Sequence, residues 1–281
     1  EHAMLRSILV ALDDTPGAQA ARDAAFALAR RTGARLTAAV VLDRPHTASD
    51  HEFVPIGGAA FKARRDARLA AQAEAEARAA LAACAARAGD TPYDVLRLED
   101  APEPALLAAG APHDLIIVGR DCTLGREEAE DGVAPVIEEL LKESTKPLLV
   151  VPPGTQAKIP PEGVRAEGPI LAAYDGSSPA RAALRALGTL GLAESSPVIV
   201  ATVGPDAATT AAEGAALRPG ATALALEGDD EAAAILGAVA SRRARMLVMG
   251  AFGSGVLKRL LAGSLTHTLL RDATVPVLIS R

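Results

Sequence analysis

Short apolar runs alternate with long alanine-rich segments along this chain. The runs have the length of buried strands, and the alanine-rich segments have the apolar spacing of helices. Strands that alternate with helices predict a parallel sheet covered by helices on both faces. In the first half the pattern predicts the strands 6–12, 35–42, 93–98, 114–119 and 147–151, and the helices 16–32, 59–89, 102–110 and 133–144.

The second half repeats this order. Each copy opens with an apolar strand that leads to an Asp, followed by a short turn and a Pro at the start of an Ala-rich helix. The paired Asp13 and Asp175 lie 162 positions apart, whereas Gly119 and Gly250 lie 131 apart, so the second copy is about 31 residues shorter. The missing residues fall between its second and third strands, and we expect that third strand to be less well covered.

A stretch rich in Pro and Gly, residues 152–163, separates the two copies and has the composition of a linker. The sequence therefore predicts a first domain over 4–151, a linker over 152–168 and a second domain over 169–281. In such open parallel sheets, ligands bind at the carboxyl ends of the strands, near the point where the strand order reverses. Both Asp residues and both Gly residues of the repeat lie at such ends.

Composition narrows the classes of function. The chain of 281 residues has a net charge of −6, only 2% aromatic residues and no Trp, which argues against nucleic-acid binding. Its two cysteines have neither metal-type spacing nor a disulfide framework. No apolar run is long enough to span a bilayer, and residues 1–3 look like an expression remnant before Met4. We expect a cytoplasmic protein without a membrane or nucleic-acid partner.

The most informative segment follows the apolar run 246–249. It contains Gly250 and Gly253, then nine residues, then Gly263 and Ser264 before a predicted helix. Glycines at a strand end allow close backbone approach, Ser can cap the helix, and free amides at a helix start attract phosphate. The segment therefore has the parts of a nucleotide phosphate site. Glycines are also general turn formers, and Asp13 and Asp175 could simply cap the helices that follow them.

Taken together, these residues resemble the universal stress protein family, and the resemblance covers nearly the whole chain as two tandem copies. It implies an α/β fold like that of the adenine nucleotide alpha-hydrolases, with two five-stranded parallel sheets of strand order 3-2-1-4-5. It also implies that the closing strands, 147–151 and 276–280, pair the two domains as an intramolecular pseudo-dimer.

The resemblance to family members that bind ATP also implies which residues form the binding site. Adenine would lie near Asp175 and the backbone of Val203. The ribose and phosphates would lie on the glycine loop and the helix that follows it. The resemblance therefore implies ATP, ADP or AMP as ligand, with Mg²⁺ accompanying the phosphates where it is present. The residues implicated are Asp175, Val203, Gly250, Gly253, Gly263, Ser264 and the amide of Leu265.

The first half departs from this pattern. It keeps Asp13, Val41 and Gly119, but Cys122 stands where the second Gly of the motif belongs, and residues 134–135 read Ala-Pro instead of Gly-Ser. Pro has no amide hydrogen, so one phosphate donor is lost. The loop 126–131 carries four acids and one base, whereas the matching loop of the second half carries Lys258 and Arg259. We therefore predict that nucleotide binds only in the second half.

Three functions fit the motif. The first is a nucleotide-binding regulatory protein of the stress response, which acts on an unknown protein partner. The second is a slow ATPase or nucleotidyl-transfer enzyme, with Ser264, Lys258 or His267 stabilising charge; no general base is placed by spacing, so we expect at most slow hydrolysis. The third is a scaffold in which the motif is a relic, with homodimer formation left open. His46 and His51 lie in a loop whose spacing matches no metal site, and we expect none.

Overall fold

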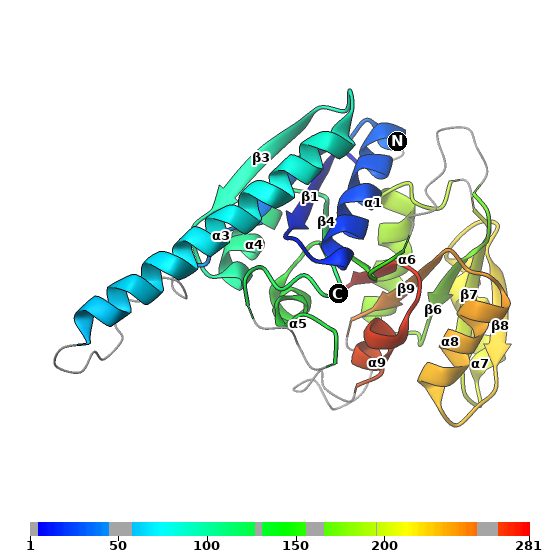
Figure 1. Ribbon diagram of the computed structural model, residues 1–281. Coiled ribbons are helices and arrows are strands. Elements are labelled where there is room, and N and C mark those ends of the chain that lie inside the picture. Colours follow the sequence, from blue (N-terminus) through cyan, green and yellow to red (C-terminus); the bar gives the residue numbers. More distant parts are fainter. Residues whose placement is uncertain (1–4, 45–57, 127–130, 156–165, 195, 252–263) are drawn as a thin grey trace.

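The computed structural model describes residues 5–44, 58–126, 131–155, 166–194, 196–251 and 264–281. The strands and helices agree with the sequence pattern to within two residues at each end in the first half (Figure 1). The strands of that half are β1 Ser7–Leu12, β2 Arg35–Val41, β3 Tyr93–Leu98, β4 Leu115–Gly119 and β5 Leu148–Val151. Its helices are α1 Pro16–Thr32, α3 Ala59–Ala88, α4 Pro102–Gly110 and α5 Pro135–Glu143.

The second half repeats this sequence of elements, with α7 as the short counterpart of α3. Its strands are β6 Ile170–Ala173, β7 Val198–Val203, β8 Thr222–Leu226, β9 Met246–Gly250 and β10 Val277–Ser280. Its helices are α6 Ser178–Thr189, α7 Ala207–Ala216, α8 Glu231–Ser241 and α9 Leu265–Asp272. The first turns of α3 project away from the body of the molecule (Figure 1).

All described strands form one sheet, with the order β3-β2-β1-β4-β5-β10-β9-β6-β7-β8. Each half keeps the predicted order 3-2-1-4-5, and the predicted pairing of the closing strands is confirmed, since β5 pairs with β10. This pairing joins the strands into one sheet, so the prediction of two five-stranded sheets is wrong. The pairing of β5 with β10 is antiparallel, with Val150 opposite Val277 and Leu148 opposite Ile279, whereas the other neighbouring strands are parallel. Two central edges that would otherwise lack partners thus satisfy each other's backbone groups.

The core lies on both faces of this sheet and continues across the two halves. In β1, Ile8, Val10 and Leu12 belong to the core on the face that α1, α3 and α6 cover, while Leu9 and Ala11 belong to the core on the face that α4, α5, α8 and α9 cover. This alternation is the two-residue period of a strand buried on both sides. The single sheet therefore gives both halves a shared hydrophobic interior.

The third strand of the second half, which the sequence predicts to be less well covered, exposes three of its five residues, whereas β3 exposes three of its six. Both are edge strands with one face against the core. The short α7 still packs on the sheet: a Cβ at its Gly214 would clash with Tyr174 and Val200. The proposed domain and linker boundaries stay a prediction.

Candidate functional site

The sequence-predicted residues converge on the carboxyl ends of three neighbouring strands. Val203 is the last residue of β7, Gly250 is the last residue of β9, and Asp175 follows β6, which lies between those two strands. The chain leaves β6 toward β7 on one side, while β9 lies on the other, so the strand order reverses here. This is the position at which open α/β sheets bind ligands.

The two Asp residues shape the turn that leads into the first helix of each half. Asp13 Oδ1 accepts from the amide of Thr15 at 2.9 Å, and Asp175 Oδ1 accepts from the amide of Ser177 at 2.9 Å. The helix caps themselves are Thr15 and Ser177, whose hydroxyl oxygens accept from the amides three residues on. The alternative that Asp13 and Asp175 cap these helices is therefore wrong, although both residues have a structural role.

Gly119 and Gly250 have a packing role in both halves. A Cβ at Gly119 would collide with the backbone of Gly17 and Ala18 at the start of α1, and a Cβ at Gly250 would collide with that of Pro179 and Ala180 in α6. Only Gly lets the end of the strand approach the helix this closely. Gly250 is therefore explained without a ligand, and its presence alone does not indicate a phosphate site.

Ser264 caps α9, as the sequence predicts. It has extended backbone angles, φ −79° and ψ 158°, and its hydroxyl oxygen accepts from the amide of His267 at 3.2 Å. Leu265 is the first helical residue, so its amide lies among the first-turn donors that no intrahelical acceptor can satisfy. Gly253, Gly263, Lys258 and Arg259 lie outside the described residues.

The matching helix of the first half begins differently. The cap of α5 is Ala134, which has no side-chain acceptor, and Pro135 is the first helical residue. Counted from the helix starts, Ala134 thus corresponds to Ser264 and Pro135 to Leu265, one position away from the pairing that the sequence predicts. The first half lacks both the hydroxyl and the amide hydrogen at these two positions.

In the first half, the loop that contains Leu124 closes the position that matches the Asp175 end of the second half. The amide of Leu124 donates to Asp13 Oδ2 at 2.9 Å, and the Leu124 side chain is 2% exposed. Leu124 has a positive φ of 53°, in the left-handed region that costs a residue with a side chain roughly 1–2 kcal/mol. This turn places both the Leu124 amide and its side chain at the strand end where a nucleotide base would lie.

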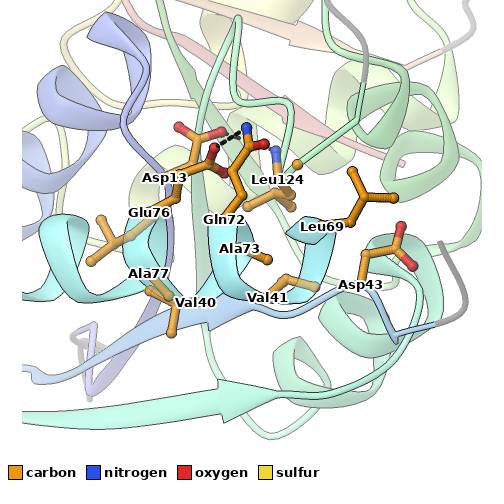
Figure 2. A pocket seen from close by; sticks show the side chains of 12 residues that line it. Asp13, Val40, Val41, Asp43, Leu69, Gln72, Ala73, Glu76, Ala77 and Leu124 are labelled. Atoms are coloured by element: carbon orange, nitrogen blue, oxygen red, sulfur yellow. Dashed lines mark hydrogen bonds between the residues drawn. The ribbon is translucent and has the colours of Figure 1, made fainter. Parts of the chain in front are cut away.

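A cavity of about 70 Å³ remains under α3 in this half. Figure 2 shows Gln72 and Glu76 of α3 above the ends of β1 and β2, with a hydrogen bond of 2.8 Å from Gln72 Nε2 to Glu76 Oε1. The acidic side of the cavity includes Asp43, which follows β2, is buried and forms an ion pair with Arg126 of the loop that contains Leu124. Sites for small molecules commonly measure about 300–1,000 Å³, so this cavity is small for a nucleotide.

Cys122, which replaces the second Gly of the motif, is fully buried. Burial, together with the neighbouring Asp13, raises the pKa of its thiol well above the usual value. A thiol of this kind forms little thiolate and is a poor nucleophile or redox centre. Cys122 therefore fills space in the closed loop.

Glu231 adds a second carboxylate to the Asp175 end of the second-half site. Partial burial, and then the charge of Asp175, raise the pKa of Glu231. The methyl group of Thr210 in α7 also approaches this turn, 3.8 Å from a Cβ built on Gly176. The sequence gives no signal for Glu231 or Thr210, because only the tertiary fold brings α8 and α7 close to this site.

Two residues of the first half contact α9 of the second half. Arg120 donates to carbonyl oxygens in the last turn of α9, and Asp131 Oδ2 lies 2.8 Å from His267 Nε2. The sequence places His267 near the phosphate loop and Asp131 in an acidic loop of the other half. The structure brings them together across the two halves. A comparison of the two copies gives one clue to Arg120, since Ala251 occupies its position in the second half.

Across the part of the chain that the structure describes, none of the helices is long and apolar enough for a membrane crossing. The same residues contain no group of three or more His, Cys, Asp or Glu that could hold a metal ion.

Solved structures share this architecture. A universal stress protein from Archaeoglobus fulgidus DSM 4304 matches all of this chain and 97% of its own, with 17% identity and a TM-score of 0.68. A putative universal stress protein from Pseudomonas aeruginosa UCBPP-PA14 matches 98% of this chain and 93% of its own, with 20% identity and a TM-score of 0.57. At these identities the likeness shows the fold.

A universal stress protein solved in complex with cAMP shares 21% identity and matches 53% of this chain and 97% of its own. That protein binds a nucleotide, but its TM-score of 0.34 is too low to carry a structural argument. None of the curated proteins matches this sequence significantly. The model of the universal stress protein family matches residues 4–152 and 206–281, which is most of the sequence. The chain therefore belongs to the universal stress protein family.

Proposed function

We propose that this protein binds one adenine nucleotide per chain, in the second half, and acts as a regulatory protein of the stress response. The base would lie against Asp175 and the backbone of Val203. The phosphates would lie on Gly250, Gly253, Gly263, Ser264 and the amide of Leu265. The observation that carries this proposal is the difference between the two helix starts: α9 begins with Ser-Leu and α5 with Ala-Pro.

The charges of the described residues support this orientation of the nucleotide. Asp175 and Glu231 place two carboxylates at one end, where they would repel phosphate. The start of α9 places amide donors and the positive end of the helix dipole at the other end. A molecule with a neutral base at one end and phosphates at the other fits this polarity.

The closed first half supports a single site. Its cavity is small, Leu124 occupies the strand end, and Pro135 has no amide to donate. Each hydrogen bond to a charged group contributes about 1.5–3 kcal/mol, so the loss of a hydroxyl and an amide donor would remove most of the phosphate affinity.

Binding in one half would give the molecule a nucleotide-dependent state. At a ligand concentration of 100 times Kd, binding stabilises the folded chain by about 2.7 kcal/mol. Such a difference would be enough to change contacts with a protein partner. Mg²⁺ would accompany ATP or ADP on the phosphate side. A cytoplasmic location and the identity of the partner stay predictions.

The direct test is to denature the purified protein and identify any adenine nucleotide that it releases. A thermal-shift titration with ATP, ADP and AMP should then raise Tm, with the preferred nucleotide giving the largest rise. The variant Ser264→Ala should reduce the rise, and Thr15→Ala, which removes a helix cap in the first half, should leave the rise unchanged.

Two results would redirect the proposal. If the intact protein releases no nucleotide and shows no shift with any of the three, the scaffold interpretation replaces it. If the protein releases inorganic phosphate from ATP well above the Ser264→Ala variant, the site is that of an enzyme.

A further inference from the structure

The helix that carries the proposed phosphate donors is held at its far end by the first half. Arg120 follows β4, and its Nη1 donates to the carbonyl oxygens of Leu270 at 3.2 Å, Arg271 at 2.7 Å and Ala273 at 2.9 Å. These groups belong to the last turn of α9, where carbonyls have no intrahelical donor. A cation at this end also interacts favourably with the helix dipole.

The guanidinium of Arg120 is partly buried, and this burial costs free energy. Burial lowers the pKa of Arg120, although Asp121 and Asp272 act in the opposite direction. Its Nε is buried without a hydrogen-bond partner among the described residues. A guanidinium that is partly desolvated and incompletely satisfied is more costly than a solvated surface arginine. The hydrogen bonds from Arg120 to α9 must offset this cost, so their geometry matters more than that of a surface ion pair.

The backbone of Arg120 is fixed by β5 and by the cap of α5. Its amide donates to Val151 at 2.9 Å, and its carbonyl oxygen accepts from the amide of Ala134, the cap of α5, at 2.8 Å. The second half repeats the first of these bonds, from the Ala251 amide to Ser280 at 2.8 Å, but Ala251 has no side chain that could reach the other half. The Arg120 side chain thus forms a clamp on α9, by which we mean its hydrogen bonds to the last turn of that helix, and Ala251 forms none in return.

A second contact reaches the other end of α9. Asp131, which precedes α5, lies 2.8 Å from His267 Nε2, and the backbone amide of the same His267 donates to the cap Ser264. The helix has eight residues and is therefore roughly 12 Å long. Two turns of helix held at both ends move as one body, so contacts with the first half set where Ser264 and the Leu265 amide lie.

We propose that Arg120 and Asp131 are positioning residues through which the closed first half aligns α9 for phosphate binding in the second half. This inference rests on the proposed nucleotide site. It gives the first half a function of its own: the half that has lost its phosphate donors supplies the clamp. Arg120 reaches the ligand only through α9, so it is expected to affect the phosphates and not the base.

The test compares three variants of the full chain. Arg120→Met keeps the apolar stem and removes the guanidinium, Arg120→Lys keeps a charged donor, and Arg271→Met removes an exposed arginine of α9 that pairs with Asp272. Hydrogen exchange of the free protein should speed up about tenfold in Arg120→Met, the size of one helix-end charge interaction, at the amides of His267 and Thr268, which donate to the hydroxyl and carbonyl oxygens of Ser264. Arg120→Lys should recover most of the protection, and Arg271→Met, which removes a solvent-exposed cation from the same helix end, should have a much smaller effect.

The nucleotide readout separates positioning from general stability. In Arg120→Met the Kd of ATP should rise about tenfold while the Kd of adenosine, which has no phosphate, stays unchanged. Unchanged exchange in α9, or equal weakening of ATP and adenosine, would overturn the inference. If the wild type binds no ATP, the proposed function fails, and the exchange pattern still decides whether Arg120 holds the start of α9. Should Arg120→Met fail to fold, Asp131→Ala provides the same exchange measurement from the other contact.

Discussion

The two halves of this protein share a fold and differ at the few positions where a phosphate would bind. Both keep a Gly at the end of the fourth strand, and in both it lets the first helix pack against that strand. Both keep an Asp that shapes the turn after the first strand. They differ at the start of the last helix, which reads Ser264-Leu265 in one and Ala134-Pro135 in the other. The retained Gly and Asp thus have a structural role in both halves, whereas the difference at the helix start bears on phosphate binding.

The largest effect is expected where the halves agree. Gly250→Ala and Gly119→Ala should each lower the free energy of unfolding by about 3 kcal/mol or prevent folding, because the added methyl group collides with helix backbone. Urea denaturation measures both. Equal losses in the two variants would sharpen the comparison. A Gly250→Ala protein that is fully stable but no longer binds nucleotide would show instead that this Gly serves the ligand.

A smaller effect is expected at Asp13 and Asp175, which occupy the same position in the two halves but have different neighbours. Asp13→Asn should lower stability by about 1–2 kcal/mol, because it weakens the hydrogen bond from the Leu124 amide that holds the loop closed. It should leave ATP affinity unchanged.

Asp175→Asn should change ATP affinity instead, through the base end of the second-half site. Urea denaturation and calorimetric titration of the two variants separate these outcomes. Loss of ATP affinity in Asp13→Asn would contradict the assignment of the site to one half.

The smallest effect concerns the thiols. Cys122 and Cys84 are buried, and burial raises the pKa of both. A raised pKa keeps the thiol protonated until the pH approaches the new value, so at pH 8 the native protein should react with neither. An aromatic disulfide reagent should detect both thiols only after denaturation. Rapid reaction of Cys122 in the native protein would contradict the closed loop of the first half.

The strands and helices were predictable because each has a clear local pattern, from the continuous apolar run of β1 to the Ala-rich α3. The pairing of β5 with β10 followed only from the family resemblance, since it joins residues far apart in the chain. The closing strands look alike in sequence, and nothing local states whether they end two sheets or join one.

The site was predictable in part. Gly250 and the Ser264 cap follow from glycine placement and helix-start chemistry, although the packing role of Gly250 becomes visible only with the structure. The contacts of Leu124, Arg120 and Asp131 join segments that are far apart in the chain and become visible only in the folded structure. The acidic loop predicts repulsion of phosphate in its own half, whereas its Asp131 contacts the helix of the other half.

The most direct test of the central claim imposes the helix start of one half on the other and counts bound nucleotide by calorimetric titration with ATP. The wild type should bind one ATP per chain. Ser264→Ala with Leu265→Pro gives α9 the start of α5 and should lower affinity at least 100-fold, because a hydroxyl and an amide donor are lost. Pro suits the first helical position, so the fold should persist. Ala134→Ser with Pro135→Leu should leave one ATP per chain at unchanged affinity. Two ATP per chain in the wild type, or undiminished binding after the change in α9, would contradict the account.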